Sequence, residues 1–284
     1  MKCMKAWKIF NKQKPTSRFS LCSLRSFAVN FFCGFDEENR MPKVAVIVVG
    51  AGSGSRFGQG RNKIFAKVAG QAMFLRTLSA FGSRDDVCQS IFVCSQADRP
   101  EIQDQFAGHL GLMGISLVTG GQTRSQSVRN ALAEVSDQAQ LICVHDAARP
   151  CIAQAWIDAV FHAAAKTGAA MLALPIHGTV KRVDENNLIT QTLPRDQFAG
   201  LWEAQTPQVF QRDILLAAYE ADADATDDAA LVEATGQAVK IVPGDGRNIK
   251  VTTPADLKFV NEVFKTLPKP AANRLAHPFR EDLR

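Results

Sequence analysis

The stretch from Lys43 to Lys67 constrains the fold most, because a short apolar run leads directly into a glycine-rich loop. Residues Val44–Val49 are mostly β-branched, which is typical of a parallel strand buried on both faces. Arg56 and Lys63 then add positive charge, so the segment predicts a phosphate-binding loop after a buried strand. Four glycines of this loop allow the backbone to approach a ligand where a Cβ atom would collide: Gly50, Gly52, Gly54 and Gly58.

Two familiar glycine loops do not fit this stretch. A dinucleotide-binding loop requires GxGxxG and an acidic residue about 20 positions later, but the third glycine is missing and the first acid is Asp85. A Walker loop requires GK[ST], whereas Lys63 stands between Asn62 and Ile64. A flexible glycine loop that carries two separated cations instead suits a nucleoside triphosphate whose α-phosphate gains charge during substitution. The alternative is an ordinary turn with solvated basic residues.

Apolar periodicity predicts that strands and helices alternate after this loop. The alternation predicts a Rossmann-like α/β fold, a mostly parallel sheet with helices on both faces. Ligands should bind at the carboxyl ends of the strands, where Gly50, Gly120 and Asp146 fall. The predicted strands are 44–49, 90–94, 115–118, 141–144 and 170–174, and the predicted helices are 74–81, 102–110, 125–135 and 156–165.

The pattern changes between residues 175 and 205. Thr179–Val183 and Leu188–Thr192 alternate apolar with polar residues around turn residues 184–187, which predicts a β-hairpin. This protruding hairpin has no core of its own to cover it, so we expect an arm that reaches another subunit. An edge extension of the main sheet is an equal alternative.

The excess positive charge lies in the first forty residues. The 284-residue chain carries a net charge of +5, but residues 1–40 hold eight basic and three acidic residues, and the rest balances at 25 of each. A neutral body without clustered basic residues argues against a nucleic-acid partner. The longest apolar part of the extension, Phe27–Phe35, is too short to span a bilayer, so we expect no membrane anchor.

These observations divide the chain into three parts. We expect residues 1–40 to be a disordered extension, 41–267 to form the catalytic domain, and 268–284 to be a poorly ordered tail. The extension fits a transit peptide or, as we prefer, a start codon placed too early, with Met41 the true start. Seven cysteines without a CxxC pair favour a reducing cytoplasm.

Seven segments in a fixed order resemble the 2-C-methyl-D-erythritol 4-phosphate cytidylyltransferase family of the non-mevalonate isoprenoid pathway. They are GAGSGSRFG with NKIF, GGQTRSQSV, VHDAARP, GTVKRV, LWEAQTPQVF, ATDDA and GRNIKVTTPADL, spanning about Pro42 to Phe264. The resemblance implies a nucleotide-diphospho-sugar transferase fold whose hairpin arm swaps between the subunits of a homodimer. It also implies that CTP reacts with a polyol phosphate and releases pyrophosphate. The alternatives are a ribitol 5-phosphate cytidylyltransferase and a nucleotide-binding protein without catalysis.

The implied reaction needs positive charge rather than a strong base, since the attacking phosphate is already anionic. We expect Arg56 to hold the triphosphate and Lys63 to place a charge on the α-phosphate. Asp146, at the end of LICVHD, is the candidate ligand of Mg²⁺ shared with substrate phosphates and waters. The alternatives are that Asp146 pairs with Arg149 or caps the helix beginning near Ala153.

The resemblance assigns further residues, two of which, Arg195 and Thr206, lie in or near the arm and would serve the neighbouring subunit. Arg195 aligns less securely, because four residues separate it from the GLW segment. We expect Arg124 to support the nucleotide loop and His145 to be a partly buried, hydrogen-bonded residue rather than a metal ligand. We expect the segment 226–228 to cap a helix, with Thr226 and Asp227 within reach of the substrate. The nucleotide-binding assignments are Gly50, Ala51, Gly52, Ser53, Gly54, Gly121, Gln122, Ser127 and Ala147, and the acceptor assignments are Asp146, Thr179, Arg195, Thr206 and Lys250, of which Arg195 and Lys250 also count as catalytic.

Overall fold

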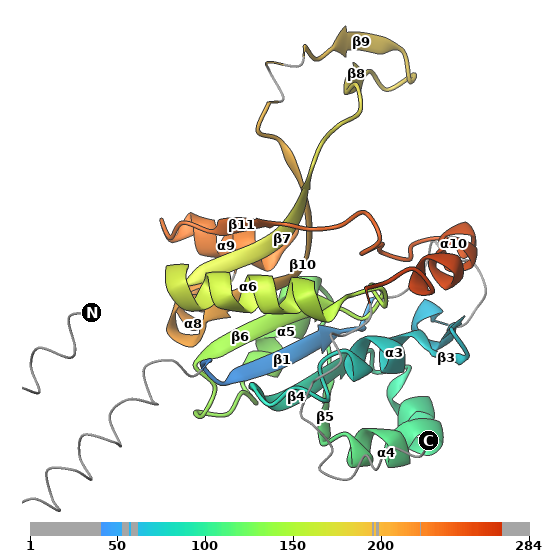
Figure 1. The fold of residues 1–284 in the computed structure, drawn as a ribbon, viewed down its shortest axis with the longest axis vertical. Helices are drawn as coiled ribbons and strands as arrows, with labels where there is room; N and C mark the ends of the chain where they lie inside the picture. The colour runs from blue at the N-terminus through green and yellow to red at the C-terminus, as the bar shows by residue number, and fades with distance from the viewer. Residues whose placement is uncertain are drawn as a thin grey trace, which may run out of the picture. The chain divides into compact units, whose positions relative to one another are not determined.

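Seven strands form one mixed sheet in the computed structural model of the protein, which describes residues 41–52, 57, 62–194, 196, 199–221 and 223–268. The order across the sheet is β11-β7-β10-β6-β1-β4-β5 (Figure 1). All neighbours pair in parallel except β10, which runs antiparallel to both β6 and β7. The predicted mostly parallel α/β sheet is therefore confirmed. The strands are β1 (Val44–Val49), β4 (Val87–Cys94), β5 (Ile115–Thr119), β6 (Leu141–Asp146), β7 (Ala169–Pro175), β10 (Trp202–Gln211) and β11 (Lys240–Pro243).

Helices cover both faces of this sheet, because the central strands are apolar on both sides. Val44, Val46 and Val48 of β1 pack into one buried cluster, and Ile47 packs into the cluster on the opposite face. The first face carries α3 (Met73–Ser79), α4 (Arg99–Leu112) and α6 (Gln154–Thr167), and the second carries α5 (Arg124–Leu132), α8 (Arg212–Glu220) and α9 (Asp228–Ala234). A third cluster packs α10 (Pro254–Phe264) against the short strand β2 (Lys67–Val68), which pairs with β3 (Gln71–Ala72).

The predicted strands and helices all occur, with their ends displaced by a few residues. The predicted helix 125–135, for example, begins at Arg124 and ends at Leu132. Sequence periodicity did not identify β10, whose buried half contains Gln205, Thr206 and Gln208. These polar side chains are buried because distant parts of the chain supply their hydrogen-bond partners.

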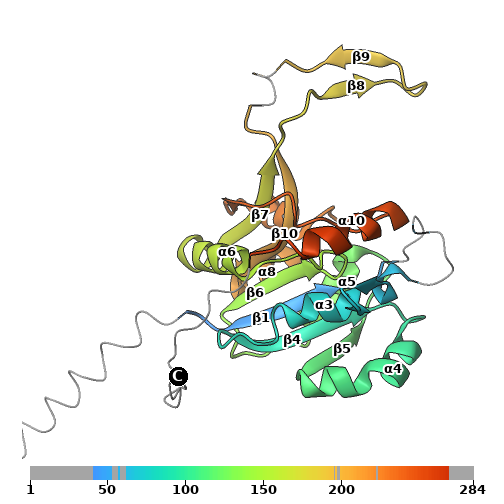
Figure 2. The same ribbon diagram turned by 45° about the vertical axis from the view of Figure 1, so that its right-hand side comes forward.

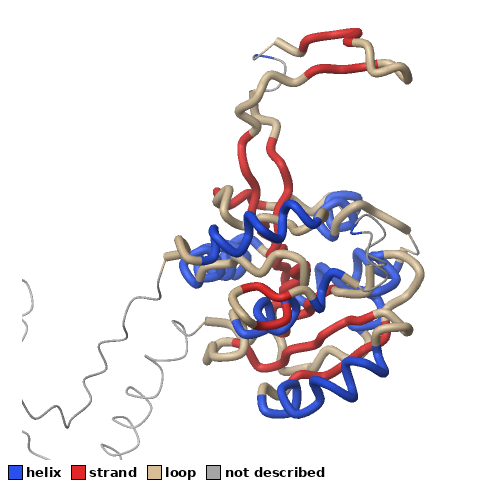
Figure 3. Tube along the Cα trace, turned by 90° about the vertical axis from the view of Figure 1, so that its right-hand side faces the viewer, coloured by secondary structure: helices blue, strands red, loops and turns tan. Residues whose placement is uncertain are grey.

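The predicted hairpin is present as β8 (Lys181–Val183) and β9 (Ile189–Thr192). In its turn, Asp184 Oδ1 accepts hydrogen bonds from the backbone N–H groups of Asn186 and Leu188, both at 2.9 Å. The two strands form a separate sheet, so the alternative of an edge extension is wrong. They project from the ends of β7 and β10, away from the helices (Figures 2 and 3). Contact with a second subunit stays a prediction.

The expectations for the two ends of the chain lie outside the described residues. Within the described ranges, no helix is both long and apolar enough to cross a membrane.

Gly50 is required where β1 ends, and this yields a stability prediction. A Cβ atom at Gly50 would lie 2.8 Å from the ring of Phe92, which is fully buried and stacks on Phe74 at a centroid distance of 4.8 Å. We expect Gly50→Ala to lower the free energy of unfolding by about 1–3 kcal/mol, since the ring has little space to move. Urea denaturation measures this change.

Gly52→Ala is the matched control, because no atom of the described residues lies within 4 Å of a Cβ placed there. Its effect should stay below about 1 kcal/mol. Equal losses in the two variants would contradict the role assigned to Phe92.

Candidate active site

A cavity of about 390 Å³ opens at the carboxyl ends of the central strands. Its walls come from the loop after β1, the loop after β5 with the start of α5, and the turn after β6. Lys63 and Lys250 complete the lining from two further segments. The cavity thus lies at the edge of the sheet where the sequence predicts ligands.

The loop after β5 approaches the loop after β1 closely because Gly120 has no side chain. A Cβ atom there would collide with the Cβ of Ala51 and lie 2.7 Å from Ser127 Oγ. Ser127 Oγ accepts from the Gly121 N–H at 3.1 Å and donates to the Thr123 carbonyl at 2.8 Å. Ser127 therefore orders the loop that forms this wall of the cavity.

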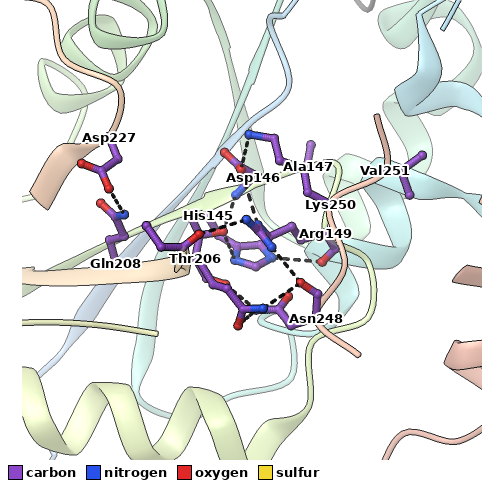
Figure 4. Close-up of polar contacts among 12 residues, drawn as sticks. His145, Asp146, Ala147, Arg149, Thr206, Gln208, Asp227, Asn248, Lys250 and Val251 are labelled. Carbon is purple, nitrogen blue, oxygen red and sulfur yellow. Dashed lines mark hydrogen bonds and ion pairs between the residues drawn. The ribbon is translucent and has the colours of Figure 1, made fainter. Parts of the chain in front are cut away.

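Asp146 is a nearly buried carboxylate, and three cations of the described residues lie within 4 Å of it. Lys250 Nζ lies 2.7 Å and Arg149 Nε 3.6 Å from Oδ2, and Arg124 Nε lies 3.8 Å from Oδ1 (Figure 4 includes the first two). Burial alone would raise the pKa of Asp146, but Lys250, Arg124 and Arg149 outweigh it and hold that pKa well below its usual range. Pairing with Arg149 is thus present but secondary to Lys250. The alternative of a cap is wrong, because the N-terminus of α6, with Ala153 as its N-cap residue, has no side-chain cap hydrogen bond.

Arg124 is held in place by a buried carboxylate. Its Nη2 lies 2.7 Å from Oδ2 of Asp228, which is fully buried, and the Tyr219 hydroxyl donates to the other oxygen at 2.6 Å. The helix cap in this segment is Asp227, which accepts from the Ala230 N–H at 3.0 Å. Arg124 thus ties the start of α5 to α9, as expected of a residue that supports the nucleotide loop.

His145 is fully buried and hydrogen-bonded, in line with the sequence prediction, although that prediction expected only partial burial. Its Nε2 lies 3.1 Å from the carbonyl oxygen of Arg149 and its Nδ1 lies 3.0 Å from Thr206 Oγ1 (Figure 4). Burial lowers the pKa of His145 to about 4, so the imidazole is neutral at physiological pH. Within the described residues, no group of three or more histidine, cysteine, aspartate or glutamate side chains is arranged to hold a metal ion.

Lys63 starts the short 3₁₀ helix η3 (Lys63–Phe65) at the rim of the glycine loop. Its Nζ donates to the carbonyl of Val251 at 2.8 Å, next to Lys250. Asn62 caps η3 and also donates to the carbonyl of Gly52 at 3.1 Å. The two lysines therefore reach one cavity from distant parts of the sequence.

Comparison with known proteins identifies the family. The family model described as 2-C-methyl-D-erythritol 4-phosphate cytidylyltransferase matches residues 44–265. The chain belongs to this family. A relative of that name from Rhodopirellula baltica is 39% identical over 239 residues, covering 80% of this chain and 96% of the relative. Another, from Dechloromonas aromatica, is 40% identical over 229 residues, covering 79% and 99%.

Solved structures agree with this assignment to the cytidylyltransferase family. The crystal structure of 4-diphosphocytidyl-2C-methyl-D-erythritol synthase from Anaerococcus prevotii superposes with a TM-score of 0.66 at 28% identity, covering 79% of this chain and 96% of that one. The crystal structure of 2-C-methyl-D-erythritol 4-phosphate cytidylyltransferase from Thermus thermophilus gives 0.65 at 29% identity, covering 78% and 99%. The resemblance drawn from the seven sequence segments is therefore confirmed.

The residues to which the cytidylyltransferase resemblance assigns roles fall into three groups. Ala147, Thr179 and Thr206 do not line the cavity: Ala147 and Thr206 are buried, and Thr179 is exposed at the base of the arm. Outside the described residues are Ser53, Gly54, Arg56 and Arg195. The cavity brings together Gly50, Ala51, Gly52, Lys63, Gly121, Gln122, Ser127, Asp146 and Lys250.

Sequence reasoning did not identify Tyr219 and Asn248 as parts of the site's support. Asn248 is fully buried, and its carbonyl accepts from Arg149 Nη1 at 2.7 Å. Its position in the sequence, two residues before Lys250, could have identified Asn248, because residues near a site often orient the side chains that bind the ligand. Tyr219 is the only tyrosine of the chain, but its spacing from Asp228 carries no recognisable pattern.

The ionised state of Asp146 predicts the acid stability of the metal-free protein. The pKa of Asp146 is lower in the folded state than in the unfolded state. Asp146 therefore adds to the free energy of unfolding above about pH 4, and this contribution is lost as the pH falls further. We expect Asp146→Asn, measured by urea denaturation with EDTA, to be about 1–3 kcal/mol less stable at pH 7. Its stability should also depend less on pH below 4.

Asp104→Asn is the control, because Asp104 is an exposed carboxylate on α4. This variant should follow the wild-type pH profile. A profile of Asp146→Asn parallel to the wild type would show that Asp146 is not held ionised by its neighbours.

Proposed function

We propose that the protein transfers the cytidylyl group of CTP to 2-C-methyl-D-erythritol 4-phosphate, giving 4-diphosphocytidyl-2-C-methyl-D-erythritol and pyrophosphate. The observation that carries the proposal is the meeting of Lys63, Lys250 and Asp146 in one cavity beside the glycine loops. Membership of the cytidylyltransferase family supplies the identity of the substrates. The neutral body and the cavity rich in cations suit two anionic reactants.

The reaction is a substitution at the α-phosphorus of CTP. An oxygen of the acceptor phosphate forms the new P–O bond, and the bond to the β-phosphate breaks as pyrophosphate leaves. The acceptor phosphate is mostly dianionic at neutral pH, so no residue needs to remove a proton. Lys63 stabilises the charge that develops on the α-phosphoryl oxygens, together with Arg56, which lies outside the described residues. Lys250 binds the acceptor phosphate.

The proposal includes Mg²⁺ at Asp146. The residues fit an ion held by one carboxylate, substrate phosphates and waters, because Asp146 is ionised. Among the described residues, the ion pair of its Oδ1 is with Arg124 Nε at 3.8 Å, beyond hydrogen-bond distance. When bound, the ion would neutralise and orient the phosphates. Lys250 would then exchange its bond with Oδ2 for one with substrate phosphate.

The proposal also includes a homodimer formed through the arm. Val183, Leu188 and Ile189 expose 47%, 64% and 63% of their surface on the β8–β9 hairpin. Such apolar exposure on a projecting hairpin favours contact with a second protein surface. In a dimer, Arg195, which lies outside the described residues, would serve the neighbouring cavity, whereas Thr206 is buried in its own subunit. Among the described residues, Cys88, Cys94, Cys143 and Cys151 are free thiols, which suits a reducing cytoplasm.

The activity test uses purified protein, CTP, Mg²⁺ and either 2-C-methyl-D-erythritol 4-phosphate or ribitol 5-phosphate. Pyrophosphate release should require the acceptor and should favour the methylerythritol compound. Lys63→Ala should lower turnover by about 100-fold or more, because a donor to the transition state is lost. Thermal unfolding should show that the variant is folded.

Lys67→Ala is the matched control, since Lys67 is an exposed lysine of β2 outside the cavity. It should turn over at the wild-type rate. Release of pyrophosphate without acceptor, or an undiminished rate in Lys63→Ala, would contradict the proposed mechanism. A preference for ribitol 5-phosphate would instead show that this compound, and not 2-C-methyl-D-erythritol 4-phosphate, is the acceptor.

The dimer predicts that a charge on the arm separates the subunits. Leu188→Glu with Ile189→Glu should convert a dimer to a monomer, because two apolar side chains would become charged at the contact. Light scattering after size-exclusion chromatography measures the mass. Leu112→Glu is the control, as Leu112 is 92% exposed at the end of α4. A wild-type monomer would refute the arm-mediated dimer.

A further inference from the structure

The side-chain amide of Asn62 joins three segments at one wall of the cavity. Its Nδ2 donates to Oδ2 of Asp98 at 2.7 Å and to the carbonyl of Gly52 at 3.1 Å, and its Oδ1 accepts from the Ile64 N–H at 3.3 Å. A carboxylate and a carbonyl accept hydrogen bonds, whereas a backbone N–H donates, so these partners fix the orientation of the amide and use both of its hydrogens. Gly52 and Lys63, the residue after Asn62, both line the cavity.

Asp98 occupies the N-cap position of α4 but does not cap that helix. An aspartate at this position ordinarily accepts a hydrogen bond from a backbone N–H of the first turn. The side chain of Asp98 makes no such bond. Its Oδ2 instead accepts from Asn62 Nδ2 and from Ser95 Oγ, the latter at 2.5 Å, and Ser95 Oγ accepts from the Asp98 N–H at 3.0 Å. The carboxylate is therefore directed towards Asn62 rather than towards its own helix.

Buried side chains hold the two supports of the Asn62 amide in place. Ile64 and Phe65 of η3 are buried, and the ring of Phe65 stacks on Phe106 of α4 at a centroid distance of 6.2 Å. This packing joins η3 to α4 independently of the amide. The hydrogen bonds of Asn62 therefore connect Gly52, at the cavity wall, to two elements that the core already fixes.

We propose that Asn62 is a positioning residue for CTP, which holds Gly52 and Lys63 in a fixed relation, and that Asp98 in turn holds Asn62. This inference rests on the proposed function and deepens it, since Lys63 and the glycine loop are the parts of the site that would meet the triphosphate. The hydrogen bond between Asn62 and Asp98 is the strongest of the set, because its acceptor is a carboxylate.

Calorimetric titration with CTP and Mg²⁺, without an acceptor, tests the inference. Asn62→Asp keeps the size of the side chain, removes both donors and places two carboxylates side by side. We expect the Kd for CTP to rise about tenfold or more. Adding Asp98→Asn to this variant should recover about threefold or more, because the new amide at position 98 can donate to the new carboxylate at position 62 while Ser95 still donates to its oxygen.

Steady-state kinetics should show that the effect is confined to the nucleotide. Asn62→Asp should lower kcat/KM for CTP about tenfold or more, while the KM for the acceptor changes less than about twofold. Asp98→Ala, which removes the support of Asn62, should shift both values in the same direction. Asp104→Ala is its matched control, because Asp104 is an exposed carboxylate on the same helix, and it should behave as the wild type.

Equal affinities for CTP in the wild type and Asn62→Asp would overturn the inference, and so would a double variant no better than the single one. If Asn62→Asp does not fold, an unchanged CTP affinity in Asp98→Ala would overturn it instead. The expected changes in CTP binding, in a protein that releases no pyrophosphate with either acceptor, would refute the proposed function and leave the role of Asn62 intact. The two failures are therefore distinguishable.

Discussion

The site depends on keeping one nearly buried carboxylate ionised. Burial opposes the charge of Asp146, and an unpaired carboxylate at such a position would bind a proton. Three cations prevent this, and they come from three different segments: Lys250 from the loop before α10, Arg149 from the turn after β6, and Arg124 from the start of α5. Because the cations outnumber the carboxylate, the cavity favours anionic ligands.

The cations in turn depend on partners placed behind them. Asp228 and Tyr219 hold Arg124 from α9 and α8, and the Asn248 carbonyl holds Arg149. Each guanidinium therefore has a fixed orientation before any ligand arrives. Preorganised charges of this kind cost little reorganisation when a substrate binds, which is the condition for strong electrostatic stabilisation of a transition state.

Close backbone approaches give the cavity its shape. Gly50 lies against the ring of Phe92, and Gly120 lies against Ala51 and Ser127, with no space for a Cβ atom at either position. Both glycines directly follow parallel strands, β1 and β5, so the two loops converge at the same edge of the sheet. The ring of Phe92 supplies the physical reason for glycine at position 50.

The amino-acid sequence by itself determined the alternating strands and helices, the glycine loop after β1 and the position of Asp146 at a strand end. These features follow from local periodicity and from the rule that parallel strands end at one edge. Only the tertiary structure decided that β10 inserts antiparallel between β6 and β7, that the arm is a separate sheet, and that Lys250 is the closest partner of Asp146. The physical reason is that buried hydrogen bonds and ion pairs, such as Thr206 with His145 and Asp228 with Arg124, join residues far apart in the chain, and no local pattern records such pairs.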